Sequence, residues 1–309
     1  MTNFRFSSVV VRDEVATAVH EGRGVVALET TIVVHGLPSP VNLEVARECE
    51  TSVRNGGSVP ATIGVLDGRV VVGLTSDELE RLADPQRGAA KLSARDLGIA
   101  LAAGTDGAMT VAATITIAEH VGISVMATGG LGGVHRDANK SYDESADLTA
   151  LSRRSVLVVA SGVKSILDIG ATLERLDTLG VPVVGYGTHQ FPGFYLRDSG
   201  FELDWSVASA DEAAGAFLCH RELMATGFLV ANPVAANQEL DRHLHDEALE
   251  GALTRAQLEG VSGKAVTPTL LAEFARHTGG LSVEVNRDLV VANAGLAGAI
   301  ATSLARDLA

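Results

Sequence analysis

The sequence predicts an α/β fold of three layers, α/β/α, with a mixed, mostly parallel central sheet and a helical C-terminal third. From about residue 24 to residue 232, short apolar runs typical of buried parallel strands alternate with stretches of helical spacing. After about residue 205 the pattern becomes mainly helical. Because no Pro- or Ser-rich linker and no internal repeat divides the chain, residues 1–309 are expected to form a single domain.

The expected strands are short apolar runs bounded by glycine, polar or turn residues. In chain order they cover 24–34, a hairpin over 59–74, 123–130, 155–162, 181–188 and 227–234. The hairpin is expected to turn at Asp67-Gly68, a strong turn dipeptide, and to add an antiparallel edge to the sheet.

The expected helices place apolar residues at helical spacing, and several follow a residue that can cap a helix. They cover 39–57, 76–83, 110–122, 165–179, 208–226, 237–259, 268–278 and 284–305. Ser76 is the expected cap of the helix over 76–83, and Ser165 can cap the helix over 165–179.

Composition narrows the classes of function. A net charge of -14 argues against binding to nucleic acid or to an acidic membrane, although a small phosphorylated ligand needs only a few local donors. Cys49 and Cys219 have no metal-ligand spacing and indicate no disulfide scaffold, which favours a reducing cytoplasm. The N-terminal residues lack a signal-type apolar core, and no apolar run reaches about eighteen residues, so no membrane span is expected.

Lys164 lies in the turn between an apolar strand and the expected helix over 165–179. In α/β proteins such turns lie at the carboxyl ends of strands, where ligands bind. Only four of the 24 basic residues are lysines, namely Lys91, Lys140, Lys164 and Lys264. Because lysine can lose its proton and form an imine, whereas arginine cannot, this usage favours a chemical role for at least some of the lysines. Lys140 is best interpreted as a solvated loop charge.

A glycine-rich turn over 126–137, MATGGLGGVHRD, follows another expected strand. Glycine lets backbone N–H groups approach an anion such as phosphate, but a plain tight turn explains the pattern equally well. The spacing matches neither a dinucleotide fingerprint nor a P-loop. His135, taken alone, is more often structural.

Three further features have both a functional and a structural interpretation. Asp143, Glu144 and Asp147 can share a hard cation or sugar hydroxyls, or they can form a solvated helix start capped by Ser145. Glu29 lies in an apolar strand, where burial would raise its pKa toward that of a general acid unless it forms a structural ion pair. Lys91, before an expected helix start at Ser93, suits a phosphate clamp or a plain surface position.

Together these segments resemble the pseudouridine-5′-phosphate glycosidase family, also called the indigoidine-synthase-A-like family. The resemblance covers nearly the whole chain and is carried by many ordered motifs: ALETTIVVHGLPSPVN, GSVPATIGVLDGRVVVGL, KLSARDL, TVAAT, ATGGLGGVHR, SADL, KSILDIG, GVPVVGY, ANPV, TPTLL and TGGLSVEVNRDLV. It implies reversible cleavage of the C–C glycosidic bond of pseudouridine 5′-phosphate to uracil and ribose 5-phosphate. It also implies a divalent metal, commonly Mn²⁺, and a homotrimer.

The resemblance also implies roles for individual residues. Lys164 matches the nucleophile that forms an imine with C1′ of the sugar, Glu29 the proton donor, and Asp143 the metal position, whose ion is held largely through water. The implied substrate-binding residues are Lys91, Val111, His135, Ser145, Ala146, Asp147 and Asn286, the last of which reads the uracil.

These residue types suit the implied chemistry. A C-glycoside has no leaving oxygen to protonate, so hydrolysis by paired carboxylates fails. Condensation of C1′ with an amine allows the C–C bond to break, and the amine must be neutral to attack. A carboxylate with water ligands suits a hard ion such as Mn²⁺.

The chain departs from the family pattern in several places. The family's EST is Glu29-Thr30-Thr31, Val163 replaces the usual alanine before the lysine, and TPFLL becomes TPTLL at 267–271. The family's paired asparagines are Ala292-Asn293, and residues 186–195 form a variable region that contains His189.

The last three departures could alter the side of the site that receives the aglycone. They leave open a C-glycosynthase that joins ribose 5-phosphate to another aromatic ring. A phosphosugar-binding protein without catalysis is a further alternative, which the intact Glu29 and Lys164 disfavour. A Schiff-base aldolase would require a (β/α)₈ barrel, which the helical last third fits poorly.

Overall fold

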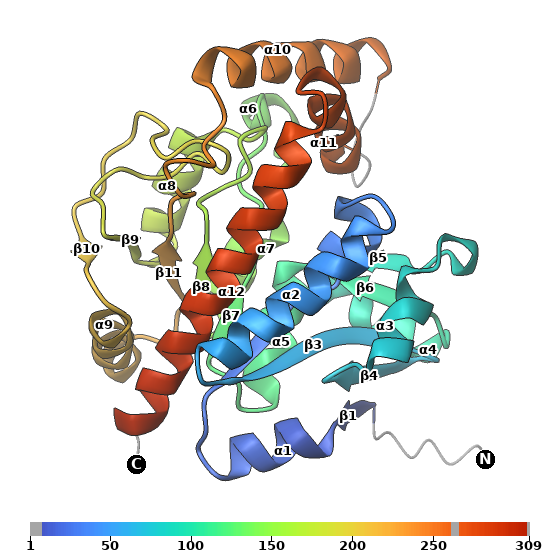
Figure 1. The fold of residues 1–309 in the computed structure, drawn as a ribbon, viewed down its shortest axis with the longest axis vertical. Helices are drawn as coiled ribbons and strands as arrows, with labels where there is room; N and C mark the ends of the chain where they lie inside the picture. The colour runs from blue at the N-terminus through green and yellow to red at the C-terminus, as the bar shows by residue number, and fades with distance from the viewer. Residues whose placement is uncertain (1–7, 261–265, 308–309) are drawn as a thin grey trace.

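The computed structural model describes residues 8–260 and 266–307. Over these residues it contains an 11-stranded mixed sheet with the order β1-β4-β3-β2-β7-β8-β11-β9-β10, and β6 and β5 branch from β3 (Figure 1). The strands are β1 (Val9–Val11), β2 (Val25–Leu28), β3 (Val59–Leu66), β4 (Arg69–Val72), β5 (Ala90–Leu92), β6 (Gly107–Met109), β7 (Val125–Ala127), β8 (Leu157–Ala160), β9 (Val183–Tyr186), β10 (Ser206–Val207) and β11 (Phe228–Ala231).

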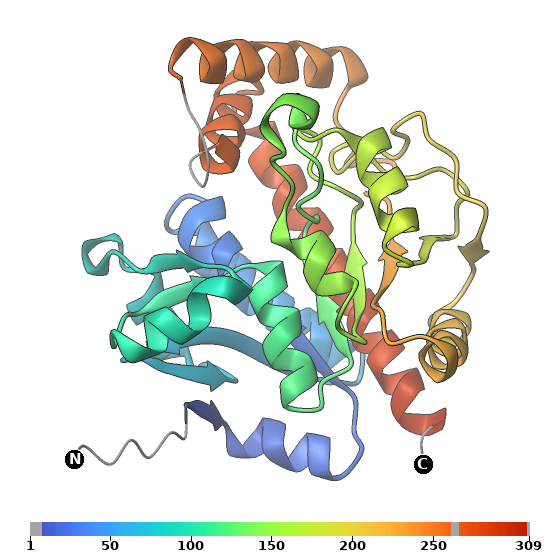
Figure 2. The ribbon, with the colours of Figure 1, turned by 180° about the vertical axis from the view of Figure 1, so that it is seen from behind.

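Helices cover both faces of this sheet, which confirms the predicted three-layer α/β/α class (Figures 1 and 2). One face packs against α2 (Val41–Asn55), α9 (Ala210–Leu223) and α12 (Leu281–Asp307), and the other against α1 (Asp13–His20), α5 (Val111–His120), α7 (Ala146–Leu151) and α8 (Ile169–Thr178). The remaining α-helices are α3 (Ser76–Ala83), α4 (Leu97–Ala102), α6 (Ala138–Ser141), α10 (Arg242–Leu258) and α11 (Val266–His277).

Parallel pairing aligns the central strands. β2 pairs with β7, β7 with β8, β8 with β11, and β11 with β9, all in parallel. The side chains of β2, β7, β8 and β11 are buried on both faces, as the continuous apolar runs predict. The carboxyl ends of β2, β7, β8 and β11 therefore lie side by side at one edge of the sheet, below α10 and α11 at the top of Figure 1.

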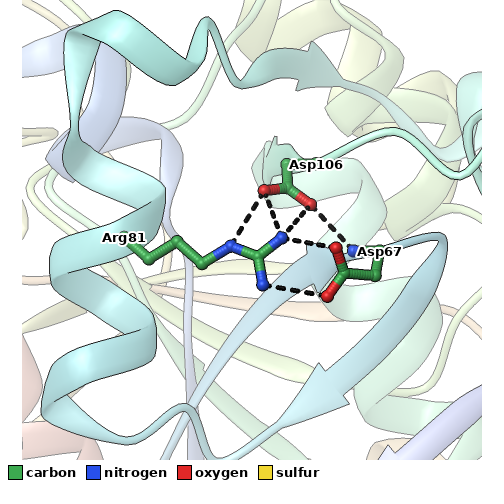
Figure 3. A network of polar contacts seen from close by, with 3 residues as sticks. All are labelled: Asp67, Arg81 and Asp106. Atoms are coloured by element: carbon green, nitrogen blue, oxygen red, sulfur yellow. Dashed lines mark hydrogen bonds and ion pairs between the residues drawn. The ribbon is translucent and has the colours of Figure 1, made fainter.

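The predicted hairpin is present, but it does not form the edge. β3 and β4 pair antiparallel around the Asp67-Gly68 turn, whereas β1 pairs parallel with β4 and lies outside it. Arg81 on α3 binds the carboxylates of Asp67 and Asp106, and the backbone N–H of Asp67 also donates to Asp106 at 2.7 Å (Figure 3). This network holds the hairpin turn against α3 and the start of β6.

Two predicted element boundaries and one predicted cap are wrong for local reasons. The strand expected over 24–34 ends at Leu28, and a single π-helical turn covers Ile32–Gly36. Between them Thr30 turns inward, donates to Ile63 O at 2.8 Å and accepts from Met109 N at 2.9 Å. These bonds lead the chain out of the sheet.

The other two concern caps. The helix expected over 165–179 begins at Ile169, because Asp168 caps it by accepting from Ala171 N at 3.0 Å, and Ser165 stays in the preceding turn. Thr75 caps α3 instead of Ser76, because Thr75 and Glu78 exchange hydrogen bonds in a capping box.

α12 crosses the face of the sheet beside α2 (Figure 1). It is the one helix of residues 8–260 and 266–307 that is long and apolar enough to span a membrane by length and composition, although no such span was expected. Its apolar residues pack against β2, β7 and β8, and more than half of its most apolar stretch is buried inside the protein. This is the behaviour of a core helix.

Glycines allow α2 and α12 to approach closely. A Cβ atom added at Gly298 would lie 2.6 Å from the carbonyl oxygen of Val53, and one at Gly56 would lie 2.8 Å from the carbonyl oxygen of Gly295. Both contacts are with backbone atoms, which cannot rotate away. The glycines therefore set the distance between the two helices.

We expect Gly298→Ala to lower the free energy of unfolding by about 1–3 kcal/mol, because the added methyl overpacks this contact. Gly215→Ala in α9 is the matched control: no described atom lies within 4 Å of its added Cβ, so helix propensity should raise stability by up to about 1 kcal/mol. Urea unfolding measures both values. A Gly298→Ala chain as stable as the parent would contradict the close approach.

Candidate active site

A pocket of about 310 Å³ opens at the carboxyl ends of the central strands. All ten residues singled out from the sequence line it, although they lie between residues 29 and 286 of the chain: Glu29, Lys91, Val111, His135, Asp143, Ser145, Ala146, Asp147, Lys164 and Asn286. The fold therefore brings together every one of these positions. Lys140 lies outside the lining and pairs with Asp137 at 3.0 Å, and Lys264 lies outside the described residues.

Glu29 is the residue directly after β2, and its carboxyl group lies deep in the pocket wall. Burial raises its pKa above the ordinary value, and the positive charge of Lys164 opposes that rise. The hydroxyl of Thr128, directly after β7, donates to Glu29 Oε1 at 2.5 Å. A carboxyl group with a raised pKa retains a proton that it can give to a substrate.

Lys164 lies in the turn after β8, as predicted, and its ammonium group donates to the carbonyl oxygen of Gly130 at 2.7 Å. The turn needs glycine at Gly162, where φ is +79° and a Cβ would lie 2.1 Å from the carbonyl oxygen of Pro192. The N–H of Lys164 also donates to Leu131 O at 3.1 Å. The lysine is thus tied to the glycine-rich turn at both its backbone and its amine.

Asp147 binds backbone amides. Its buried carboxylate accepts from Ala112 N and from Gly132 N, both at 2.9 Å, so it joins the start of α5 to the glycine-rich turn. Ser145 caps α7 by accepting from Asp147 N at 3.2 Å, as the structural interpretation predicted. Glycine is required at Gly132, because a Cβ there would lie 2.3 Å from Ser145 Oγ.

The three acidic residues do not share a cation site. Glu144 pairs with Arg175 at 2.9 Å, and Asp147 is engaged by amides, which leaves Asp143. In the described part of the chain, no group of three or more His, Cys, Asp or Glu side chains is placed to hold a metal ion. Asp143 is partly exposed and its Oδ2 lies 3.9 Å from His135 Nδ1.

His135 is a neutral donor or acceptor at this side of the pocket. Burial lowers its pKa; nearby Asp143 opposes the shift, and the positive charges of Lys91 and Lys164 reinforce it. A single carboxylate beside a neutral imidazole fits a hard divalent ion that keeps most of its water ligands.

The other wall comes from distant parts of the chain. Lys91 is the middle residue of β5, Val111 begins α5, and Asn286 lies in the second turn of α12. Asn286 is buried, and no described atom forms a hydrogen bond with its Oδ1. That oxygen can accept from an N–H group such as those of a pyrimidine ring.

Several lining residues were not predicted. His35, in the π-helical turn, has a pKa lowered first by burial and then by the charge of Lys91. Phe194 adopts a φ of +67°, which is unusual for a bulky residue, and its ring lies against Gly130. Thr267 and Leu271 of α11 complete the wall. The departures at 186–195 and 267–271 were the available signals, since both segments reach the pocket.

Comparison with known proteins accounts for this arrangement. The family model described as "Indigoidine synthase A like protein" matches residues 14–303. The chain belongs to the indigoidine synthase A-like family.

Relatives of this indigoidine synthase A-like chain agree over nearly its full length. It is 57% identical to the pseudouridine-5′-phosphate glycosidase of Salinispora tropica, covering 94% of this chain and 90% of that one. It is 54% identical to the enzyme of that name from Streptomyces griseus, with 94% and 91% covered. The prealnumycin C-glycosynthase AlnA, solved in complex with ribulose 5-phosphate, superimposes with a TM-score of 0.90 at 39% identity, covering 98% of both chains.

The raised pKa of Glu29 has a consequence for stability. Between its unfolded and folded pKa values, the folded chain holds a proton that the unfolded chain has lost, so stability falls as pH rises above about 4.5. We expect Glu29→Gln to be more stable than the parent at pH 7, with a difference that shrinks toward pH 4.

Urea unfolding at several pH values measures this difference. Glu14→Gln is the matched control, because Arg54 lowers the pKa of Glu14. That variant should be less stable than the parent at pH 7, and the loss should vanish as pH falls. A Glu29→Gln difference that does not change with pH would contradict the raised pKa.

Proposed function

We propose that this chain cleaves the C–C glycosidic bond of pseudouridine 5′-phosphate reversibly, giving uracil and ribose 5-phosphate through a lysine imine. The observation that carries the proposal is the placement of Glu29 and Lys164 in one pocket, each tied to the segment 128–130. The names of the relatives at 57% and 54% identity support the substrate.

The residues divide the reaction between them. The neutral amine of Lys164 attacks C1′, the bond from C1′ to the ring oxygen breaks, and Glu29 gives that oxygen a proton. The lysine nitrogen loses a proton, and its lone pair then expels the uracil carbon, which keeps the electron pair of the C–C bond and takes up a proton. Water hydrolyses the resulting iminium to ribose 5-phosphate and free Lys164.

The rest of the pocket would bind and orient the substrate. Lys91 can neutralise the phosphate, Asp147 holds the glycine-rich turn in place, and Asn286 can accept from a uracil N–H. The homotrimer that the resemblance implies and the cytoplasmic location that the cysteine usage favours stay predictions.

Asp143 is the residue that would hold Mn²⁺, with water as the other ligands and His135 beside it. When bound, such an ion adds positive charge near the sugar phosphate. The assignment rests on the match of Asp143 to the family's metal position, and the donor type and partial exposure of Asp143 support it.

The experiment supplies pseudouridine 5′-phosphate and Mn²⁺ and measures uracil by liquid chromatography. We expect release by the wild-type chain and a loss of at least about a thousandfold in Lys164→Arg, which keeps the charge but cannot form an imine. Borohydride with ribose 5-phosphate should trap a sugar adduct on Lys164 in the wild type alone. Lys140→Arg, which lies outside the pocket lining, is the matched control.

The outcomes separate the alternatives. Trapping at Lys164 without uracil release would favour the C-glycosynthase, for which the likeness to AlnA is the supporting observation. If the wild-type chain neither releases uracil nor traps ribose 5-phosphate, the enzymatic proposal is contradicted. A sugar-binding protein then remains as the alternative.

A second experiment addresses the metal. We expect Asp143→Asn to raise the Mn²⁺ concentration needed for half-maximal activity by roughly tenfold or more, because a neutral amide binds a hard cation weakly. Asp137→Asn, an exposed change in the same loop, should leave that concentration unchanged. Equal Mn²⁺ dependence in Asp143→Asn and the wild type would remove Asp143 from the metal site.

A further inference from the structure

Asn293 is a fully buried polar residue in the middle of α12, an otherwise apolar part of the helix. It lies seven residues after Asn286 and therefore faces the same side, toward the sheet. Unlike Asn286, it does not line the pocket. A buried amide costs free energy unless its hydrogen-bonding groups are satisfied, so its partners show why it is tolerated.

Its partners come from the ends of three adjacent strands. The amide nitrogen donates to the carbonyl oxygen of Thr128, directly after β7, at 2.9 Å, and lies 3.1 Å from the hydroxyl of Ser161, directly after β8. Its oxygen accepts from Asn232 Nδ2, directly after β11, at 2.9 Å. One side chain on α12 thus joins β7, β8 and β11 at the point where each leaves the sheet.

The same segment holds the two reactive groups. The hydroxyl of Thr128 donates to Glu29, and the carbonyl oxygen of Gly130, two residues later, accepts from Lys164 Nζ. Asn293 also lies 3.4 Å from the carbonyl oxygen of Gly129. Asn293 therefore fixes the backbone between Thr128, which binds Glu29, and Gly130, which binds Lys164.

We propose that Asn293 is a positioning residue, which sets the separation of the Glu29 carboxyl group and the Lys164 amine by fixing residues 128–130. The inference rests on the proposed function, because the kcat that tests it is measured in that reaction. A displacement of reacting groups by about 1 Å can cost roughly a hundredfold in rate. The loss should appear in kcat, because Asn293 does not itself line the pocket.

The test compares Asn293→Ala with the wild type and with Ser303→Ala. Ser303 is also buried on α12, but it donates to Asp211 on α9, away from the pocket. We expect Asn293→Ala to lower kcat for pseudouridine 5′-phosphate roughly 10- to 100-fold, with KM changed less than about threefold. The rate of borohydride trapping of ribose 5-phosphate on Lys164 should fall in parallel. Ser303→Ala should keep the wild-type kcat, even if its Tm falls.

A purely structural role gives a different pattern. The proposal is wrong if Asn293→Ala lowers Tm but keeps the wild-type kcat once activity is divided by the fraction of chains that trap ribose 5-phosphate on Lys164. It is also wrong if Asn293→Ala changes only KM. Should Asn293→Ala fail to fold, Ser161→Ala and Asn232→Ala each remove one partner of the amide, and unchanged kcat in both overturns it.

The proposed function can fail separately. If the wild-type chain traps ribose 5-phosphate but releases no uracil, the trapping rate alone decides the role of Asn293. If the wild-type chain traps nothing, both proposals are overturned.

Discussion

Parallel backbone hydrogen bonding fixes where β2, β7, β8 and β11 end relative to one another. The pocket depends on these relative positions, because it forms at the ends of the strands. The last residues of β2 and β7 pair with each other, as do those of β8 and β11, and the last residue of β7 pairs with the next-to-last residue of β8. A shift of one residue in any strand would turn its next side chain to the opposite face. The residues that follow the strands therefore lie in a row across the sheet that is offset by one residue between β7 and β8: Glu29, Thr128, Ser161 and Asn232.

One residue of this row, Glu29, carries a buried ionisable group of a kind that an apolar protein core usually lacks. Burial makes the charged form of Glu29 unfavourable, and the charge of Lys164 and the hydroxyl of Thr128 offset only part of this cost. A chain selected for stability alone would place an apolar residue there. The retained acid is understandable where a proton must be held ready for a substrate.

Local pattern was enough to predict the fold class, and the resemblance to the family supplied the full set of pocket residues. Continuous apolar runs indicated buried parallel strands, and ordered motifs marked Glu29 and Lys164. Ser165 was wrongly favoured as a cap because Asp168, three residues on, competes successfully for the first free amide of α8. The partners of Asn293 were inaccessible to such reasoning, since Thr128 lies 165 residues away along the chain.

The place of α12 after Glu29 and Lys164 in the chain has a consequence for biosynthesis. A chain is made from its N-terminus, and its early parts can begin to fold before the rest is complete. The strands that precede Glu29 and Lys164 emerge well before Leu281, where α12 begins. A growing polypeptide thus carries its acid and its amine while the helix that supports them is still missing, and it can complete the pocket only after the residues of α12 have been made.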